Sequence, residues 1–294
     1  MTDMIKAEVA RYYDLVSTDY GRQYDRTQFE TLNQYPQNYF RLQILVNRLA
    51  VAGARRVYEV GVGEGTPPAM MASMGFDVAG CDVSQAMVSK TIEHLKSLGQ
   101  KNPDIQWADV EDCLTFANQA GEPYDAAFAF RVLPHVHKPA VMLSNLHALV
   151  GGKGKVFVEF RNKFFALTTF NRFTHDFIMN DLLGDVADDV KAKSAETIAA
   201  HVDMNLPPKP TGDGPDYGSI MANFHNPFEL LELFEETGFE NPRIHWYHYH
   251  PGLPRHGKEL GWRWREEAMK LEHEASGWRG MFLCSAGVVE ADAV

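Results

Sequence analysis

Cysteine is scarce in this sequence of 294 residues, and its spacing suggests no cross-link or metal site. Only Cys81, Cys113 and Cys284 occur, and none forms a C-x-x-C pair. Neither a disulfide framework nor a zinc knuckle is therefore predicted, and a reducing cytoplasm is the expected compartment. Long apolar runs are also missing: no segment has the roughly 18 uncharged residues that a membrane-spanning helix needs. The N-terminal residues lack the apolar core of an export signal, so we expect a cytoplasmic protein without a membrane partner.

Basic residues are outnumbered by acidic ones. Lys and Arg total 28 against 39 Asp and Glu, which gives a formal charge of −11. Such a surface repels a phosphate backbone, so nucleic acid is not expected as a partner. Hydrophobic residues make up 45% of the chain and charged residues 23%, as in a globular protein with an apolar core. The length is roughly twice that of a typical domain, which leaves one enlarged domain or two small ones open.

The middle of the chain alternates between strand-like and helix-like segments. Strands are predicted at residues 56–60, 76–81, 104–107, 126–130 and 155–160. Helices are predicted before and between them at residues 39–50, 67–74, 84–98 and 140–150, with Ser84 as a candidate N-cap. Repeated βα units of this kind predict an α/β fold with a doubly wound, mostly parallel sheet. Ligands of such sheets bind outside the carboxyl ends of the strands.

Residues 162–224 interrupt this alternation. The pattern predicts helices at 167–183 and 186–202 and a turn-rich loop at 206–218. It then resumes with a helix at 226–237 and two strand-like stretches at 242–250 and 281–289, which we expect to be antiparallel edge strands. We therefore predict an N-terminal helical cover at 1–54, a core at 55–161 and 225–294, and an inserted segment at 162–224. Long excursions from compact folds are usually functional, so the insert is expected to be a lid or substrate-binding segment, or else the dimerisation arm of a homodimer.

A glycine-rich loop follows the first predicted strand. It carries Glu59, Gly61, Gly63 and Gly65 and leads into a predicted helix. Glycines allow the backbone to turn tightly and to approach a ligand, and the helix N-terminus offers free N–H donors. A dinucleotide fingerprint would need a further glycine where Thr66 stands. The loop therefore predicts a nucleotide-like cofactor other than a dinucleotide.

Two carboxylates near this loop refine the expected ligand. Asp82 ends the second predicted strand, where a carboxylate can accept hydrogen bonds from both hydroxyls of a ribose. Glu59 directly precedes the glycines and suits a ligand ammonium group. Because Glu59 and Glu64 would repel a pyrophosphate, a cationic nucleoside is the better fit.

These motifs resemble those of a known family. Glu59-x-Gly-x-Gly-x-Gly65, Asp82, Asp109-Val-Glu-Asp112 and Arg131-Val-Leu-Pro-His135 are similar to the successive motifs of class I S-adenosylmethionine-dependent methyltransferases. The resemblance covers roughly residues 40–160 and 225–290. It implies a seven-stranded, Rossmann-like sheet whose last strand is inserted antiparallel.

The resemblance also implies S-adenosyl-L-methionine as the cofactor and assigns residues to it. Glu59, Gly61, Gly63 and Gly65 would line its methionine and ribose part. Asp82, with Val83 beside it, would hold the ribose hydroxyls. By the same pattern, Asp109 and Val110 would flank the adenine, and Arg131 would lie near the methionine end.

Three histidines are candidate catalytic residues. His135 lies beyond the fourth predicted strand, where a histidine suits proton removal from an acceptor. A hydrogen-bonded turn residue is the alternative interpretation. His248 and His250 fall in Ile244-His-Trp-Tyr-His-Tyr-His250, where strand alternation puts Trp246, His248 and His250 on one face. We expect them to line a polar acceptor pocket, with an ordinary half-buried aromatic strand as the alternative, and we predict no metal site.

Several residues are candidate contacts to the acceptor. Arg161 and Lys163 lie at the end of the fifth predicted strand, and Arg172 lies on the first predicted helix of the insert. Cations at this edge of the sheet can receive a carboxylate or phosphate. Pairing with acids of the insert is the alternative. His225 opens the last part of the core, and Tyr13 belongs to an aromatic N-terminal segment, with Tyr12 and Tyr20, that resembles the cover of many small-molecule methyltransferases.

The sequence therefore predicts a methyltransferase that acts on a small molecule. The acceptor atom is expected to be oxygen or nitrogen, and the acceptor to be anionic, sugar-like or natural-product-like. Methylation of a protein or RNA is the first alternative, although no basic, aromatic-interleaved stripe supports RNA. A non-catalytic protein that binds S-adenosylmethionine is the second.

Overall fold

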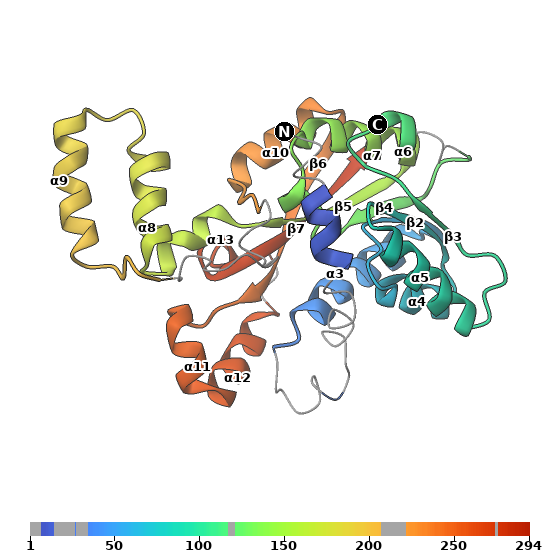
Figure 1. Cartoon of the computed structure of the whole chain (residues 1–294), viewed down its shortest axis with the longest axis horizontal. Coiled ribbons are helices and arrows are strands. Elements are labelled where there is room, and N and C mark those ends of the chain that lie inside the picture. The colour runs from blue at the N-terminus through green and yellow to red at the C-terminus, as the bar shows by residue number, and fades with distance from the viewer. Residues whose placement is uncertain (1–6, 15–26, 28–34, 117–120, 207–221, 274–275) are drawn as a thin grey trace.

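The computed structural model describes residues 7–14, 27, 35–116, 121–206, 222–273 and 276–294. Its centre is a seven-stranded sheet with the strand order β3-β2-β1-β4-β5-β7-β6 (Figure 1). The predicted residues Tyr20 and 207–218 lie outside the described ranges.

Five parallel strands form one part of the sheet. They are β1 (Arg56–Val60), β2 (Asp77–Asp82), β3 (Asp104–Trp107), β4 (Ala126–Ala129) and β5 (Lys155–Arg161). The order reverses beside β1, so the carboxyl ends of β1 and β4 flank a crevice of the kind that binds ligands in doubly wound sheets. The predicted parallel sheet is confirmed.

The last two strands are antiparallel to their neighbours. β6 (Phe239–Tyr249) pairs with β7 (Cys284–Ala293), and β7 pairs on its other side with β5. Of these two strands only β6 lies at an edge of the sheet, so the expectation of an edge strand is wrong for β7. The expectation from the resemblance, that the last strand is inserted antiparallel, is confirmed. Burial explains the placement: nearly every residue of β7 is buried, as a strand covered on both sides requires.

Helices cover both faces of the sheet (Figure 1). On one face lie α3 (Gln37–Ala52), α4 (Thr66–Ser73) and α5 (Gln85–Ser97), and Leu45 and Leu49 of α3 pack against Phe128 of β4. On the other face, α7 (Pro139–Val150) packs against β4 and β5, and α10 (Pro227–Glu236) packs against β6 and α7. Each fully buried large apolar side chain contributes about 1.5–3 kcal/mol. Ser84 caps α5 as predicted, because its hydroxyl accepts a hydrogen bond from the N–H of Met87.

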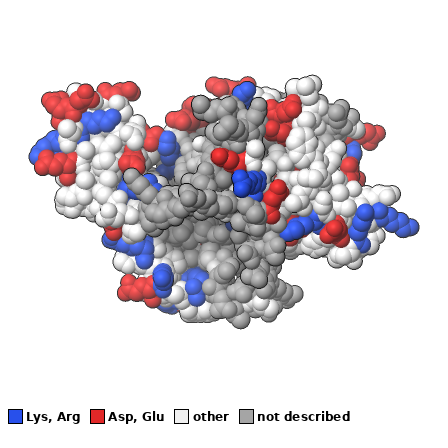
Figure 2. Space-filling model, viewed as in Figure 1, with Lys and Arg blue, Asp and Glu red and all other residues white. Residues whose placement is uncertain are grey.

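The insert is less regular than predicted. Instead of one helix over 167–183 it contains the short turns η5 (Lys163–Thr168) and η6 (Ile178–Leu182) around α8 (Arg172–Phe177). The break occurs because Phe170 has a left-handed φ of 51° and Asn171 starts a new helix with a capping box. A separate helix, α9 (Asp188–Ala199), follows and projects with α8 from the body of the molecule (Figure 1). Acidic and basic side chains both occur at this projecting end, as they do elsewhere on the same face (Figure 2).

Short helices at several places were not predicted. They are α6 (Cys113–Phe116), α11 (Gly257–Leu260), α12 (Trp262–Leu271) and α13 (Gly280–Leu283). Most of them lie in the connection between β6 and β7 and lack long apolar periodicity. Within the described ranges, no helix has both the length and the apolar composition needed to cross a lipid bilayer.

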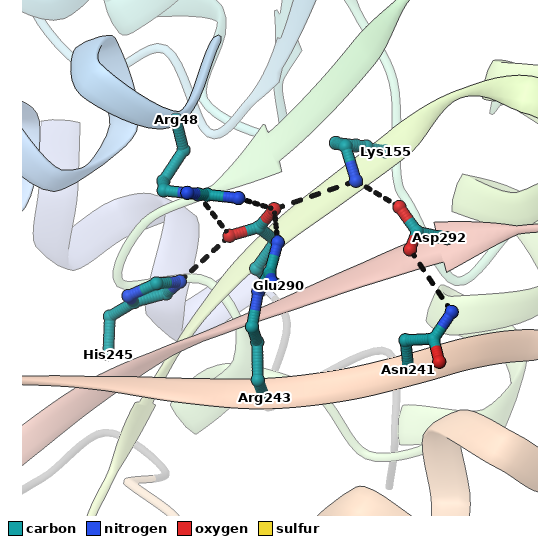
Figure 3. A network of polar contacts seen from close by, with 7 residues as sticks. All are labelled: Arg48, Lys155, Asn241, Arg243, His245, Glu290 and Asp292. Atoms are coloured by element: carbon teal, nitrogen blue, oxygen red, sulfur yellow. Dashed lines mark hydrogen bonds and ion pairs between the residues drawn. The ribbon is translucent and has the colours of Figure 1, made fainter. Parts of the chain in front are cut away.

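A buried carboxylate joins α3 to the antiparallel strands. Glu290 of β7 is 1% exposed and accepts hydrogen bonds from Arg48 of α3 and from Arg243 and His245 of β6 (Figure 3). Lys155 lies between Glu290, at 3.6 Å, and Asp292. These cations hold the pKa of Glu290 well below its usual value despite burial. The network fixes the helix that reaches the site described next.

Candidate functional site

A first cavity lies at the carboxyl ends of β1, β2 and β4. Of the residues predicted to bind cofactor, catalyse or contact the acceptor, nine line it: Gly61, Gly63, Asp82, Val83, Asp109, Val110, Arg131, His135 and Tyr13. Gly61 has a φ of 77°, and a Cβ atom there would lie 2.5 Å from a methyl carbon of Val132. The loop can therefore approach a ligand closely only because this residue is glycine.

Asp82 is fixed at the floor of this cavity. Its Oδ2 accepts a hydrogen bond of 3.0 Å from the N–H of Gly63, and its Oδ1 accepts one of 2.9 Å from the N–H of Ser84. Burial raises the pKa of Asp82 to about 6, and the two backbone donors oppose that rise. Each carboxylate oxygen retains a further lone pair, so the group can still accept hydrogen bonds from ribose hydroxyls.

Glu59 and Gly65 lie behind the cavity and do not line it. Glu59 is 1% exposed, and its Oε2 has no hydrogen-bond partner among the described residues. Burial raises its pKa well above the usual value, although Arg41 opposes this. Gly65 begins α4 with a φ of 90°, and a Cβ atom there would lie 2.9 Å from the Cα of Thr91, so it permits close packing of α4 on α5. The unsatisfied oxygen of Glu59 and the glycine cradle together suit a cationic ligand.

The N-terminal segment reaches this cavity. Residues 7–14 are helical, and the hydroxyl of Tyr13 lies 3.0 Å from Nε2 of His135. Asp14 accepts a hydrogen bond from the hydroxyl of Ser84. The structure thus brings Tyr13 and His135 together as neighbours in the first cavity. Tyr13 does not line the second cavity, where its predicted contact to the acceptor would lie.

A second cavity of about 650 Å³ lies between the sheet edge and the insert. Of the predicted residues, Arg131, Arg161, Lys163, His248 and His250 line it. Its apolar walls include Phe165 and Phe173 of the insert and the nearby Phe224. A cavity of this size with aromatic walls and a few polar groups is typical of a site for a small molecule.

His248 breaks the strand alternation on which its predicted orientation depended. Its φ is 62°, so Tyr249 packs in the same core cluster as Trp246, whereas Tyr247 packs in the cluster on the other face. The prediction that Trp246, His248 and His250 share a face is therefore wrong. A left-handed residue within a strand interrupts the alternation of side chains between the two faces of the sheet, so the residues after it point to the opposite faces from those expected.

The two imidazoles are nevertheless neighbours in the second cavity. Their ring centroids are 4.8 Å apart, and Nδ1 of His248 lies 2.8 Å from the hydroxyl of Ser285. Burial lowers the pKa of His248 and also that of His250, the latter to about 4. Nε2 of His250 has no hydrogen-bond partner among the described residues. Both rings are therefore neutral near pH 7, and one nitrogen remains available to a ligand. Within the described ranges, no group of three or more His, Cys, Asp and Glu side chains is arranged to hold a metal ion.

Arg131 lines both cavities. Its φ of 59° is left-handed, which is uncommon for a residue with a side chain. Its backbone N–H donates to Oε2 of Glu159 at 3.2 Å, and its Nη2 donates to Oδ1 of Asn38 at 3.1 Å. Glu159 in turn accepts a hydrogen bond from the buried Arg41. Sequence reasoning missed Asn38, Arg41 and Glu159, because no motif marks them and α3 was expected only to pack.

The remaining predicted residues lie at the margins of the second cavity or outside it. Lys163 lines it but forms an ion pair with Asp181. Arg172 stacks over the ring of Phe173, with 4.7 Å between its Cζ and the ring centroid, and does not line the cavity. His225 does not line it either; burial lowers its pKa, and its backbone bridges to Asn162. The structure therefore does not bring Arg172 and His225 to the site.

Comparisons with known proteins agree with this geometry. A family model described as methyltransferase domain matches residues 34–243. A ubiquinone biosynthesis O-methyltransferase of Coxiella burnetii is 25% identical over 246 residues, which cover 84% of this chain and 87% of that protein. The protein of the same name from Thiobacillus denitrificans is 26% identical over 252 residues, which cover 85% and 90%.

Solved structures share the fold at lower identity. Magnesium protoporphyrin IX methyltransferase from Synechocystis PCC 6803, crystallised with S-adenosylhomocysteine, has a TM-score of 0.54 and 15% identity. The match covers 99% of this chain and 100% of that protein. A possible histamine N-methyltransferase from Thermotoga maritima has a TM-score of 0.53 and 13% identity, with coverages of 97% and 99%. With more than half of its length matched by the family model, this chain belongs to the methyltransferase domain family and is a class I S-adenosylmethionine-dependent methyltransferase.

Proposed function

We propose that this methyltransferase methylates a hydroxyl oxygen of a small molecule bound in the second cavity. The observation that carries this proposal is that the two cavities share one wall residue, Arg131. S-adenosylmethionine in the first cavity would supply a methyl group already activated on a sulfonium. Holding a nucleophile in line with that methyl group is worth up to about 7–11 kcal/mol of the barrier, so alignment of the cavities is the main catalytic requirement.

Within the first cavity, this chain's residues would bind and orient the cofactor. Asp82 would accept hydrogen bonds from the ribose hydroxyls, with Gly61, Gly63 and Val83 beside it. Asp109 and Val110 would flank the adenine. Glu59 would attract the ammonium group from behind the loop. Residues 7–14 would cover this cavity, since Val9 and Tyr13 belong to its wall.

Within the second cavity, the insert would enclose the acceptor. Phe165 and Phe173 offer apolar ring faces, and His250 offers a neutral nitrogen that can accept the proton of a hydroxyl. His248, held by Ser285, would orient the neighbouring ring. His135 is a weaker candidate for the base, because its Nε2 already lies beside the hydroxyl of Tyr13.

Oxygen is favoured over nitrogen by the charge around the cavity. An amine acceptor is an ammonium ion near pH 7, and Arg131 and Arg161 in the cavity wall would repel it. The carboxylates of the same wall are already engaged: Glu159 pairs with Arg41, Asp181 with Lys163 and Asp176 with His175. The presence of the two arginines supports an acceptor that is neutral or anionic. The similarity to O-methyltransferases in ubiquinone biosynthesis supports the same choice.

Two measurements test this proposal. Calorimetry with S-adenosylmethionine should show one site per chain. The protein is then incubated with methyl-labelled S-adenosylmethionine and a metabolite extract, and label should enter molecules that pass an ultrafilter and should survive as an alkali-stable ether. Label in protein or RNA, or in a small amine, would refute the proposal. Binding without transfer would favour a non-catalytic role, and the Asp82→Asn variant serves as the control with reduced cofactor binding.

A further inference from the structure

The boundary between the two cavities is built from charged groups that converge from several elements. The second cavity's wall contains Arg131 after β4, Glu159 and Arg161 of β5, Lys163 of η5, Asp176 of α8 and Asp181 of η6. Of the carboxylates, Glu159 is bonded to Arg41, Asp181 to Lys163 and Asp176 to His175. The described groups of this wall thus amount to three cations and three carboxylates. In a protein of charge −11, the wall of this cavity is therefore less acidic than the chain as a whole.

Arg131 is the cation nearest to the place where the two reactants must meet. It is part of both cavity walls, and its position is fixed at two points, by Glu159 through its backbone and by Asn38 through its guanidinium group. Asn38 and Arg41 are each 2% exposed, so the α3 side of this arrangement is buried and rigid. The left-handed backbone of Arg131 is strained. Strained residues of this kind are kept in place by surrounding contacts and are found mainly at functional sites.

We infer that Arg131, with Arg161 beside it in the acceptor cavity, stabilises the acceptor oxygen as an anion, and that the acceptor is therefore an ionisable hydroxyl compound such as a phenol or an enol. This inference rests on the proposed function, because it concerns the oxygen that receives the methyl group. Both residues line this cavity, and Cζ of Arg161 lies 5.6 Å from the ring centroid of Phe224 in the same wall. Guanidinium groups remain charged at all relevant pH values and donate to oxyanions in a fixed geometry.

The proton and electron balance follows from the same residues. The O–H bond of the acceptor breaks, its proton passes by way of Nε2 of His250 to solvent water, and the electron pair stays on oxygen beside Arg131. That pair then forms the new C–O bond while the methyl carbon leaves the donor sulfur, which keeps the former bonding pair as a thioether. An aliphatic alcohol fits poorly, because its hydroxyl is too weak an acid for two guanidinium groups to ionise near pH 7. An ionisable hydroxyl needs only a shift of about one to three pKa units, which is what an opposite charge at close range provides.

The test measures ionisation directly and needs no turnover. The probe is 4-nitrophenol, whose anion is coloured, titrated in the presence of the full chain saturated with S-adenosylhomocysteine. We expect the pKa of the bound probe to be lower than in buffer by about one unit or more. Arg131→Met and Arg161→Met should each reduce this shift, and Arg131→Lys should retain part of it. Arg263→Met, which removes an exposed cation of α12 that does not line the cavity, is the matched control and should leave the shift unchanged.

Three results would overturn the inference: an unchanged or raised pKa of the bound probe, a lowered pKa that survives both substitutions, or no binding of 4-nitrophenol up to its solubility limit. Circular dichroism and thermal melting of each variant establish that it is folded, and Arg161→Met provides an independent result if Arg131→Met does not fold. Label transfer to a small molecule without the pKa shift would leave the proposed function standing while this inference fails. Absence of label transfer would refute the proposed function whatever the titration gives.

Discussion

The hydroxyl of Tyr13 lies 3.0 Å from Nε2 of His135, and the two rings meet edge to face with 5.7 Å between their centroids. The two residues are 122 positions apart in the sequence. This contact links the N-terminal helix to the segment after β4, and both residues line the first cavity. The N-terminal helix is therefore part of the cavity that we propose for the cofactor.

Removing the hydroxyl of Tyr13 should therefore weaken cofactor binding. A hydrogen bond between neutral groups is worth about 0.5–1.5 kcal/mol, so Tyr13→Phe is expected to raise the Kd for S-adenosylhomocysteine by roughly 2- to 10-fold. Calorimetry measures this change. Tyr12→Phe is the matched control, because Tyr12 is not part of the cavity wall. Equal Kd values for Tyr13→Phe and the wild type would show that the contact does not contribute to binding.

Asp82 should contribute more to cofactor binding than Tyr13 does, because its hydrogen bonds to ribose would be made by a charged group. Such bonds are worth about 1.5–3 kcal/mol, so Asp82→Asn is expected to weaken cofactor binding by roughly 10- to 100-fold. The same calorimetric titration applies. Asp104→Asn, at the exposed start of β3, should leave the Kd unchanged. An unaltered Kd for Asp82→Asn would contradict the ribose role.

Alanine substitutions at Gly61 and Gly75 separate two effects: the collision of an added Cβ atom with its neighbours, and the strain of a positive φ. Both glycines have a positive φ, 77° and 91°, so alanine is strained at either position by about 1–2 kcal/mol. Only at Gly61 would the added methyl group collide, 2.5 Å from Val132, whereas nothing lies within 4 Å of it at Gly75. We predict that both variants lower the melting temperature and that only Gly61→Ala also loses cofactor affinity. A similar loss of affinity in Gly75→Ala would mean that strain alone explains the effect.

The pH dependence of methyl transfer should report His250. Burial lowers its pKa to about 4, so the ring stays neutral and able to accept a proton from alkaline pH down to about pH 5 and loses that ability below about pH 4. The rate is measured at saturating substrates with the acceptor found by label transfer. Above about pH 5, titration of His250 should therefore not change this rate. His250→Ala should reduce the rate by roughly 10²–10⁴-fold, and the exposed His256→Ala should not. An inflection near the ordinary pKa of histidine would point to another base, and His135→Ala tests that alternative.

Glu290 should stabilise the fold in a pH-dependent way. Its pKa is lowered in the folded protein, so its contribution is fully present above the unfolded-state pKa of about 4.5 and is lost as pH falls through the lower folded value. Removing one partner of a buried ion pair costs about 3–5 kcal/mol, and we expect a loss of this order for Glu290→Gln at pH 7 in urea unfolding. The difference from the wild type should shrink as the pH is lowered below about 4. Glu240→Gln, on the exposed part of β6, is the control; a pH-independent difference would contradict the electrostatic origin.

Much of the sheet could be predicted because its signals are local. The limits of β1 and β3 match the predicted segments, since a short apolar run closed by turn residues marks a buried strand. Ser84 and Asn226 mark helix starts through side chains that bond to backbone N–H groups two or three residues later. By contrast, the break at Phe170 and the left-handed His248 have no local signal, because non-glycine residues adopt positive φ only when distant contacts impose it.

The sequence by itself determined the residues of the first cavity, where we propose that the cofactor binds: Gly61, Gly63, Asp82 and Asp109 lie at the ends of consecutive strands, and the parallel sheet brings those ends to one edge. Only the tertiary structure decided the second cavity, which we propose for the acceptor. Its wall joins Arg131, Glu159, Phe165 and His248, which come from different elements. Their placement relative to one another depends on the insertion of β7 between β5 and β6. Long-range packing decides the pairing of the strands, and no local sequence pattern encodes it. The same packing places Asn38 of α3 where it accepts a hydrogen bond from Arg131.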